Sequence, residues 1–183
     1  TPIEETVDAL AELVDSGSVT RLGASNHPAW RVERARAHAL ARGAIPIDAL
    51  QLNTSYLEVR PGTRPPGVAH RFWSLDDEQR DYAETHGLEV WAYSPLISGS
   101  YDNPAKPRPE VYDHPGTTRR LAALDEVVAE TGLSRSQVVL SWLVASGVRP
   151  ILGASKSDQL DLALDATAYT LSPQAVARLN AAV

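Results

Sequence analysis

The chain has 183 residues, which is enough for one domain or for a large part of a bigger protein. Its formal net charge of -6 argues against a nucleic-acid-binding protein, which would normally carry a basic stripe. Cysteine is absent, which excludes disulfides and thiolate metal sites and fits a cytoplasmic protein, and no apolar run approaches the roughly 20 residues of a membrane span.

The first segment predicts a helix. Thr1 is the expected cap, Pro2 the first helical position, and Val7, Leu10 and Leu13 recur at helical spacing. Because the chain does not open with Met and begins in a helix, we expect that it starts partway through a longer protein. Its many Ala and Arg residues are typical of a GC-rich bacterial source.

Strands and helices then alternate along the chain. The expected strands are 19–24, 47–53, 88–93 and 150–154. The expected further helices are 28–41, 75–85, 117–131, 134–145, 157–164 and 172–182, with caps at Asp76, Ser134 and Ser172. Strands separated by helices pair in parallel through right-handed crossovers. The sequence therefore predicts an α/β fold with four parallel strands and flanking helices in a single domain, 1–183, either half of a (β/α)₈ barrel or a small open sheet.

The segment 94–116 is rich in proline and predicts a long loop rather than a helix or a central strand. A loop of this length inside a compact fold is usually functional.

Polar or aromatic side chains follow every predicted strand: Ser25 and Asn26, Gln51 and Asn53, Tyr93 and Ser94, and Ser155 with Lys156 after Gly153. The carboxyl ends of parallel strands share one rim, so these groups would converge on one cleft. Each also has a structural interpretation. Ser25 and Asn26 could cap the next helix, Gln51 could satisfy neighbouring backbone, and Tyr93 could be core packing.

Lys156 is one of two lysines in the chain. At the start of a helix facing this rim, its charge would add to the helix dipole and suit a phosphate group. The alternative is a solvated surface lysine.

The ordered motifs resemble those of the aldo-keto reductase family over almost the whole chain. They are Leu22-Gly23-Ala24-Ser25-Asn26, Leu50-Gln51 with Tyr56, Ala92-Tyr93-Ser94-Pro95-Leu96, Gln137–Trp142, Pro150–Ser155 and Gln159-Leu160. The resemblance implies a (β/α)₈ barrel, of which this chain would be the part after the fourth strand, and the reduction of aldehydes or ketones by hydride transfer from NADPH.

The resemblance also assigns roles to individual residues. Ser25, Asn26 and Gln51 would hydrogen-bond the nicotinamide carboxamide, and Tyr93 would stack on the nicotinamide ring. The pyrophosphate path would be lined by Ser94, Leu96 and Ser98. Ser155 and Lys156, after Gly153, would hold the 2′-phosphate, and Gln159 would lie along the adenosine.

Two departures from the family pattern stand out. Leu162 and Ala163 occupy the positions where the family has a Glu-Asn pair that contacts adenine. The family's catalytic Asp, Tyr, Lys and His lie on strands before the point where this chain starts, so we assign no catalytic residue. We expect the chain alone to lack reductase activity.

Other residues have less definite expectations. Aromatic residues in the loops 54–74 and 94–116 are candidate walls of a carbonyl-substrate pocket or, alternatively, packing for those loops: His70, Phe72, Trp73, Tyr101 and Tyr112. We expect His27 to line the pocket and His38 and His86 to be solvated. The competing function is a non-catalytic, nucleotide-binding regulatory half-barrel that self-associates through open strand edges or joins a missing N-terminal half.

Overall fold

The computed structural model describes residues 1–64, 66–68 and 72–182. The chain divides into two compact units, and each is described here by itself. The first unit comprises Thr1–Leu52 and Phe72–Trp91, and the second comprises Asn53–Arg71 and Ala92–Val183. The predicted pocket residue His70 lies outside the described residues.

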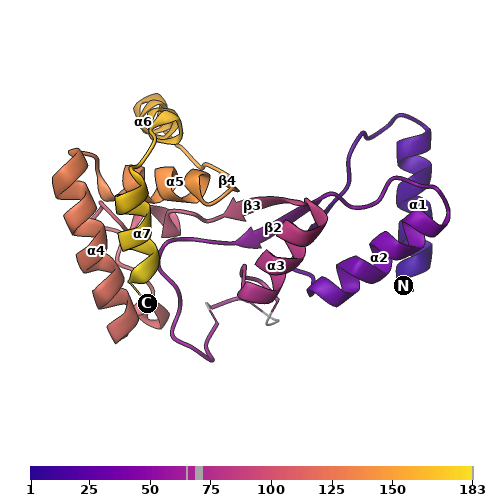
Figure 1. The fold of residues 1–183 in the computed structure, drawn as a ribbon, viewed down its shortest axis with the longest axis horizontal. Helices are drawn as coiled ribbons and strands as arrows, with labels where there is room; N and C mark the ends of the chain where they lie inside the picture. Colours follow the sequence, from indigo (N-terminus) through magenta and orange to yellow (C-terminus); the bar gives the residue numbers. More distant parts are fainter. Residues whose placement is uncertain (65, 69–71, 183) are drawn as a thin grey trace. The chain divides into compact units, whose positions relative to one another are not determined.

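Four strands follow one another in the sheet order β1-β2-β3-β4 (Figure 1). Their bounds are Gly23–Ser25, Ala49–Asn53, Glu89–Tyr93 and Val148–Pro150. β1 and β2 run parallel, with Ser25 opposite Gln51. Each consecutive pair of strands is joined through at least one helix, the kind of connection that parallel strands need. The predicted α/β alternation is therefore present.

The helices also follow the predicted order. They are α1 (Ile3–Asp15), α2 (Ala29–Ala41), α3 (Asp77–His86), α4 (Pro115–Thr131), α5 (Arg135–Ala145), α6 (Ser157–Ala168) and α7 (Pro173–Ala181). Two short 3₁₀ turns, Ile97–Gly99 and Glu110–Tyr112, lie within the predicted long loop.

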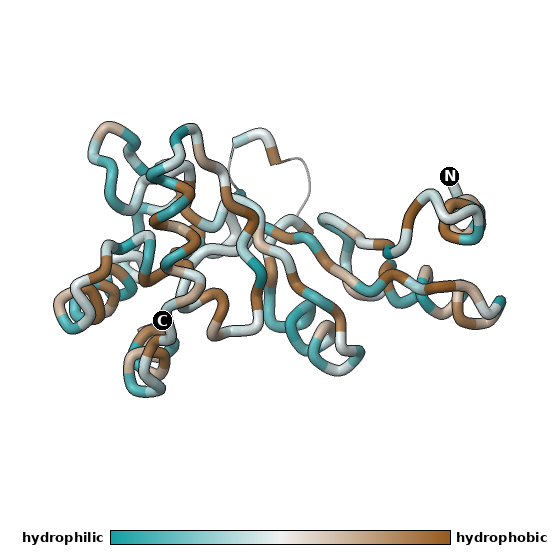
Figure 2. The backbone as a smooth tube through the Cα atoms, turned by 90° about the horizontal axis from the view of Figure 1, so that it is seen from above, coloured by the Kyte–Doolittle hydropathy of each residue, from teal (hydrophilic) through white to brown (hydrophobic). Residues whose placement is uncertain are grey.

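In the first unit, α1 packs against α2 through a small apolar cluster. Val7 of α1 and Ala35 and Ala39 of α2 are buried, and Ile3 packs beside them. Hydrophobic and hydrophilic residues are both present in the two helices, as expected of amphipathic helices (Figure 2). The burial of Val7 against α2 thus explains why an apolar residue stands at this position of the predicted helical pattern.

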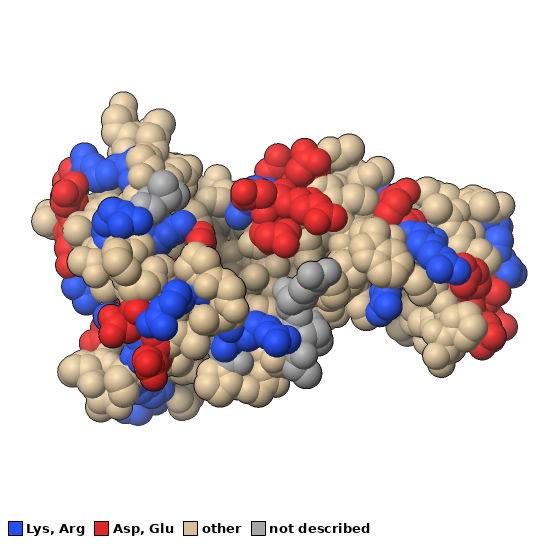
Figure 3. Space-filling view, turned by 90° about the horizontal axis from the view of Figure 1, so that it is seen from below, with Lys and Arg blue, Asp and Glu red and all other residues tan. Residues whose placement is uncertain are grey.

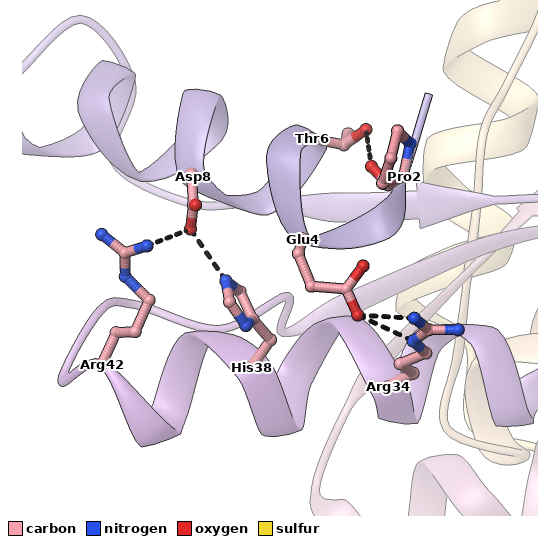
Figure 4. A network of polar contacts seen from close by, with 7 residues as sticks. All are labelled: Pro2, Glu4, Thr6, Asp8, Arg34, His38 and Arg42. Carbon is pink, nitrogen blue, oxygen red and sulfur yellow. Dashed lines mark hydrogen bonds and ion pairs between the residues drawn. The ribbon is translucent and has the colours of Figure 1, made fainter.

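Charged pairs tie the solvent side of the same two helices together (Figure 4). Arg34 donates two hydrogen bonds to one oxygen of Glu4, at 2.9 and 2.7 Å. The Asp8 carboxylate lies 2.8 Å from both His38 Nε2 and Arg42 Nη1. The expectation that His38 is solvated is wrong, because Asp8 on the facing helix holds its ring.

The start of α1 differs from the prediction. The N-cap residue is Pro2, and its side chain forms no capping hydrogen bond. Thr1, the predicted cap, therefore lies one residue before the N-cap position. The Thr6 hydroxyl donates instead to the Pro2 carbonyl at 3.1 Å.

The predicted caps of later helices are confirmed. Asp76 accepts a hydrogen bond from the Gln79 amide at 2.9 Å, and Gly87 ends α3 in the left-handed conformation at φ 64°. Ser134 and Gln137 form a reciprocal capping box at the start of α5. Acidic side chains gather over α3, whose first turn carries Asp77 and Glu78 (Figure 3).

The core of the second unit is built by α4, α5 and α7 around Tyr56. The Tyr56 ring is fully buried, and its hydroxyl donates to the Leu179 carbonyl of α7 at 3.2 Å. The Trp142 ring of α5 meets it edge-on at 5.2 Å, and the Arg120 guanidinium of α4 lies 5.5 Å from its centre. In Figure 1, α4 and α7 lie side by side, consistent with this shared core.

Two boundaries in the second unit differ from prediction. β4 ends at Pro150 instead of continuing to residue 154, although the Ile151 amide still donates to the Ala92 carbonyl at 2.8 Å. The helix predicted to end at Leu164 continues to Ala168, because Ala166 is buried and its carbonyl accepts a hydrogen bond from the Ser141 hydroxyl at 2.6 Å. Among the described residues, no helix is both long and apolar enough to cross a membrane.

Candidate functional site

A cavity of about 720 Å³ lies within the second unit, in the size range of small-molecule sites. Its walls come from the loop after β3, the start of α5, the segment after β4 and the first half of α6. Six of the residues predicted to bind a cofactor line it: Ser94, Leu96, Ser98, Gly153, Ser155 and Gln159. Residues from well-separated parts of the sequence therefore line one space. The other predicted residues, Ser25, Asn26, Gln51, Tyr93 and Lys156, are not among those that line it.

The loop after β3 enters the cavity with an unusual backbone. Ser94, Ile97 and Ser98 have φ angles of 53°, 46° and 57°, in the left-handed region that non-glycine residues rarely adopt. The Ser94 carbonyl accepts the Ile97 amide at 3.1 Å, and Ile97 is buried, which holds the turn in place. This turn leaves Ser94 and Ser98 exposed on the cavity wall.

Another part of the wall is the segment between β4 and α6. Gly153 and Ser155 are exposed there, and a Cβ atom added to Gly153 would have no neighbour within 4 Å. The Gln159 side-chain oxygen accepts a hydrogen bond from the Ser155 amide at 3.1 Å, which fixes the entry into α6. Lys156 is the N-cap residue of this helix and is exposed, but it is not among the lining residues.

The positions that depart from the family pattern also line the cavity. Leu162 and Ala163, on the second turn of α6, add apolar wall beside Leu140 of α5 and Leu152. Polar hydroxyls and amides thus occupy the two strand ends, and apolar side chains occupy the space between α5 and α6.

The sequence analysis assigned no site role to several further residues of the cavity. The start of α5 contributes Ser136 and Gln137, and the loop after β3 contributes Asp102, Asn103 and Lys106. The capping box at Ser134 marked where α5 begins, but no local pattern indicated that this end faces a cavity.

Three predicted nicotinamide-binding residues belong to the first unit. Ser25 and Gln51 are exposed and stand opposite each other on β1 and β2, and the Asn26 amide donates to the Gln51 carbonyl at 3.3 Å. Asn26 has a φ of 59°. The N-cap residue of α2 is Pro28, so neither Ser25 nor Asn26 is that helix's cap residue. The exposure of Gln51 also excludes the buried-amide interpretation.

The strand ends of β2 and β3 meet in the second unit. The Asn53 side-chain amide donates to the carbonyl of Tyr93 at 3.5 Å, and the Ser55 hydroxyl donates to that of Pro95 at 2.6 Å. Tyr93 is half-buried and is not among the residues that line the cavity. Its proposed stacking role stays a prediction.

The aromatic residues of the second unit's loops pack the fold instead of lining the cavity. The Tyr101 hydroxyl lies 2.8 Å from the Ser55 hydroxyl and accepts the Leu57 amide at 2.9 Å, and burial raises the pKa of Tyr101. Tyr112 is buried as well, and burial also raises its pKa. These contacts favour the loop-packing alternative for both residues. In the first unit, Trp73 is buried.

The other histidines occupy defined positions. His114 precedes α4 and its Nε2 lies 3.0 Å from the Glu58 carbonyl. His86 lies on α3, where its ring tilts against that of Tyr82 with centroids 4.6 Å apart. His27 is exposed after β1. No reacting group is assigned to any of them.

Comparison with known proteins shows the family to which the chain belongs. The sequence pattern described as "Aldo/keto reductase family" matches residues 1–183. Aldo-keto reductase str7 of Strobilurus tenacellus is 30% identical over 98% of the chain and 53% of its own length. Chloroplastic pyridoxal reductase of Arabidopsis thaliana is 25% identical over 93% of the chain and 46% of its own length. The chain thus spans about half the length of the curated relatives it matches.

A solved structure of an aldo-keto reductase has a similar fold. A thermostable aldo-keto reductase crystallised with the inhibitor epalrestat superposes with a TM-score of 0.72 at 24% identity, covering all of this chain and 56% of that one. The family match extends over every residue of the chain. The chain therefore belongs to the aldo/keto reductase family of oxidoreductases.

Proposed function

We propose that the chain carries the cofactor-binding part of an NADPH-dependent reductase of aldehydes or ketones. The observation that carries this proposal is the convergence of Ser94, Leu96, Ser98, Gly153, Ser155 and Gln159 on one cavity. A probable NAD(P)H-dependent D-xylose reductase of Aspergillus clavatus, 26% identical over 99% of the chain and 48% of its own length, is among the relatives.

The cavity wall has the chemistry that a phosphate-bearing cofactor needs. Ser94, Ser98 and Ser155 line it, and the hydroxyl of each can donate to a phosphate oxygen. The apolar wall at Leu140, Leu152 and Leu162 suits the faces of a nucleoside. When bound, reduced nicotinamide supplies a hydride to the carbonyl carbon of the substrate.

Lys156 and Ser155 would select NADPH over NADH. They stand at the start of α6, where the helix dipole favours an anion and where the N-cap residue provides no side-chain cap of its own. A 2′-phosphate placed there gains both the dipole and the ammonium charge. With Leu162 and Ala163 in the cavity, the adenine base would be held by apolar contact rather than by a carboxylate.

The nicotinamide end would be held by Ser25, Asn26 and Gln51, with Tyr93 against the ring. Planar side-chain amides pair with a carboxamide, and an aromatic face pairs with a ring. The exposure of Ser25 and Gln51, which stand opposite each other on β1 and β2, supports this assignment.

Calorimetric titration of the chain with NADPH and NADH tests the cofactor assignment. We expect NADPH to bind more tightly, and Lys156→Met to weaken NADPH by about ten-fold with little effect on NADH. Equal affinities of the wild-type chain for the two cofactors would contradict the role of Lys156.

We also propose that this chain by itself does not reduce carbonyls, because it has no counterpart of the family's Asp, Tyr, Lys and His. An NADPH-dependent aldehyde assay checks this, with Tyr93→Phe as the control for background turnover. Turnover by the wild-type chain well above that of the control would refute the proposal.

A further inference from the structure

We propose that Lys106 supplies the positive charge that anchors the diphosphate of the cofactor. This inference rests on the proposed function and deepens it, because it names a residue at the same cavity that the sequence motifs did not indicate. Lys106 is the one cationic residue among the described residues that line the cavity. A diphosphate placed between Ser94, Ser98 and Ser155 would otherwise meet only neutral donors from side chains.

The Lys106 side chain lies beside Gly99, in the turn after β3. Gly99 has a φ of 88°, a conformation open to glycine, and the Lys106 side chain lies across it. A Cβ atom added to Gly99 would stand 3.6 Å from Lys106 Cδ and 3.8 Å from its Nζ. The ammonium group is therefore held beside the same turn that presents Ser98.

The loop that carries Lys106 is fastened to the rest of the cavity wall. The Asp102 carboxylate accepts the amides of Arg135 and Ser136 at 3.1 and 2.9 Å, at the start of α5. The Lys106 amide donates to the Asn103 carbonyl at 3.0 Å, closing the turn that follows. The position of Lys106 is thus set by contacts with α5 and within its own loop.

The charges around Lys106 leave its ammonium available. In the part of the chain that the structure describes, no carboxylate forms an ion pair with Lys106 and no hydrogen bond occupies its Nζ. The nearest acidic group of the cavity wall, Asp102, is engaged by the α5 amides. An unpaired cation on a cavity wall rich in hydroxyls is suited to a phosphate ligand.

Substitutions of Lys106 and of Lys156 should change the affinities for NADPH and NADH differently, which makes the inference testable. Both NADPH and NADH contain the diphosphate, whereas the 2′-phosphate is present in NADPH alone. Lys106→Met should therefore weaken both cofactors by about the same factor, roughly ten-fold for one lost charge-assisted contact. Lys156→Met should weaken NADPH selectively.

The experiment is calorimetric titration of NADPH, NADH and ADP into the wild-type chain and its variants, with circular dichroism to confirm folding. Lys106→Arg should retain most of the affinity, and Arg108→Met, in the same loop but outside the cavity wall, should bind as the wild type does. The salt dependence of binding should be shallower for Lys106→Met than for Arg108→Met.

Two outcomes would overturn the inference while leaving the proposed function intact. One is unchanged binding of both cofactors to Lys106→Met, and the other is a loss confined to NADPH. If the wild-type chain bound none of the three ligands, the proposed function itself would fail, and with it this inference.

Discussion

Four non-glycine residues of the described chain have a positive φ, and all four follow a strand that ends near predicted cofactor contacts. They are Asn26 after β1, and Ser94, Ile97 and Ser98 after β3. Asparagine tolerates this region, but a β-branched residue such as Ile97 does not adopt it without strain. Such strain persists only where surrounding contacts enforce it, and it concentrates at binding sites. The backbone thus supports the same site that the side chains indicate.

The contribution of Tyr56 to the free energy of unfolding can be measured through its titration and its hydrogen bond to Leu179. Burial raises its pKa to about 12 from 10.0, so the folded state favours the neutral hydroxyl. This contribution is complete below pH 10 and is lost as the pH rises toward 12. Tyr56→Phe removes the hydrogen bond to Leu179 and should lower the free energy of unfolding by about 1 kcal/mol at pH 7. Urea unfolding measures the difference.

The pH dependence separates Tyr56 from the other buried tyrosines. The difference in unfolding free energy between wild type and Tyr56→Phe should shrink above pH 10. The Tyr112→Phe variant retains Tyr56, so its unfolding free energy should still fall above pH 10 as Tyr56 titrates. An identical difference at pH 7 and pH 11 would contradict the assignment of this titration to Tyr56.

At the scale of elements, the α1–α2 contact depends more on its apolar cluster than on its charges. Val7→Ala should lower the free energy of unfolding by about 2 kcal/mol, because it removes two methyl groups and leaves a cavity. Glu4→Gln should have a smaller effect, because Glu4 and Arg34 remain 37% and 57% exposed. Thermal unfolding of both variants would contradict this order if Glu4→Gln were the more damaging change.

The ion pair between α4 and α5 gives a second test at this scale. Arg135 donates hydrogen bonds of 2.6 and 2.7 Å to Asp125, which lower the pKa of Asp125. The resulting stability is present above the ordinary carboxyl pKa of 3.8 and is lost as the pH falls below it. Because both side chains are partly exposed, Asp125→Asn should cost less than about 1 kcal/mol at pH 7.

The control for that pair is Asp161→Asn on α6. We expect the control to lower the unfolding free energy at pH 7 by less than Asp125→Asn does. For Asp125→Asn, the destabilisation measured at pH 7 should diminish at pH 3. A destabilisation that stayed constant down to pH 2 would show that the pair contributes no charge-dependent stability.

Local chemistry explains which elements the sequence predicted well. Asp76, Ser134 and Ser172 cap helices through side-chain acceptors three residues from their donors, so the pattern is visible in the sequence. The end of β4 was misplaced because Ile151 and Leu152 continue an apolar run but line the cavity instead of extending the strand. The extension of α6 depends on burial of Ala166 against α5, a contact that α6 alone cannot reveal.

The same distinction applies to the site. Ser94, Ser98 and Ser155 could be predicted because they follow strands in ordered motifs. Lys106 could not, because its place at the cavity depends on the fold of its loop, which the hydrogen bonds of Asp102 attach to α5. Tertiary contacts of this kind leave no periodic or spaced pattern in the sequence.

At the scale of the whole molecule, we propose self-association through the edges of the sheet. Among the described residues, β1 and β4 stand at the two ends of the order β1-β2-β3-β4. Unpaired backbone at such edges can pair with another chain. We predict concentration-dependent dimers in light scattering coupled to gel filtration. A monomer at every concentration tested would contradict this expectation.

The cofactor cavity is the central claim at this scale, and a variant that fills it tests the claim directly. Gly153 lines the cavity, and a Cβ atom built there would meet no atom within 4 Å. Gly153→Trp should therefore leave the fold intact and occupy the space that the cofactor needs. Gly17→Ala is the matched control, because it changes a glycine away from the cavity. Gly17 has a φ of 73°, so this substitution should lower the stability somewhat without affecting cofactor binding.

The decisive measurement is calorimetric titration of NADPH into the wild-type chain and into Gly153→Trp. The account predicts saturable binding of one NADPH per wild-type chain, and loss of that binding in Gly153→Trp with an unchanged circular dichroism spectrum. Equal affinity of NADPH for the two proteins would contradict a cofactor site in this cavity.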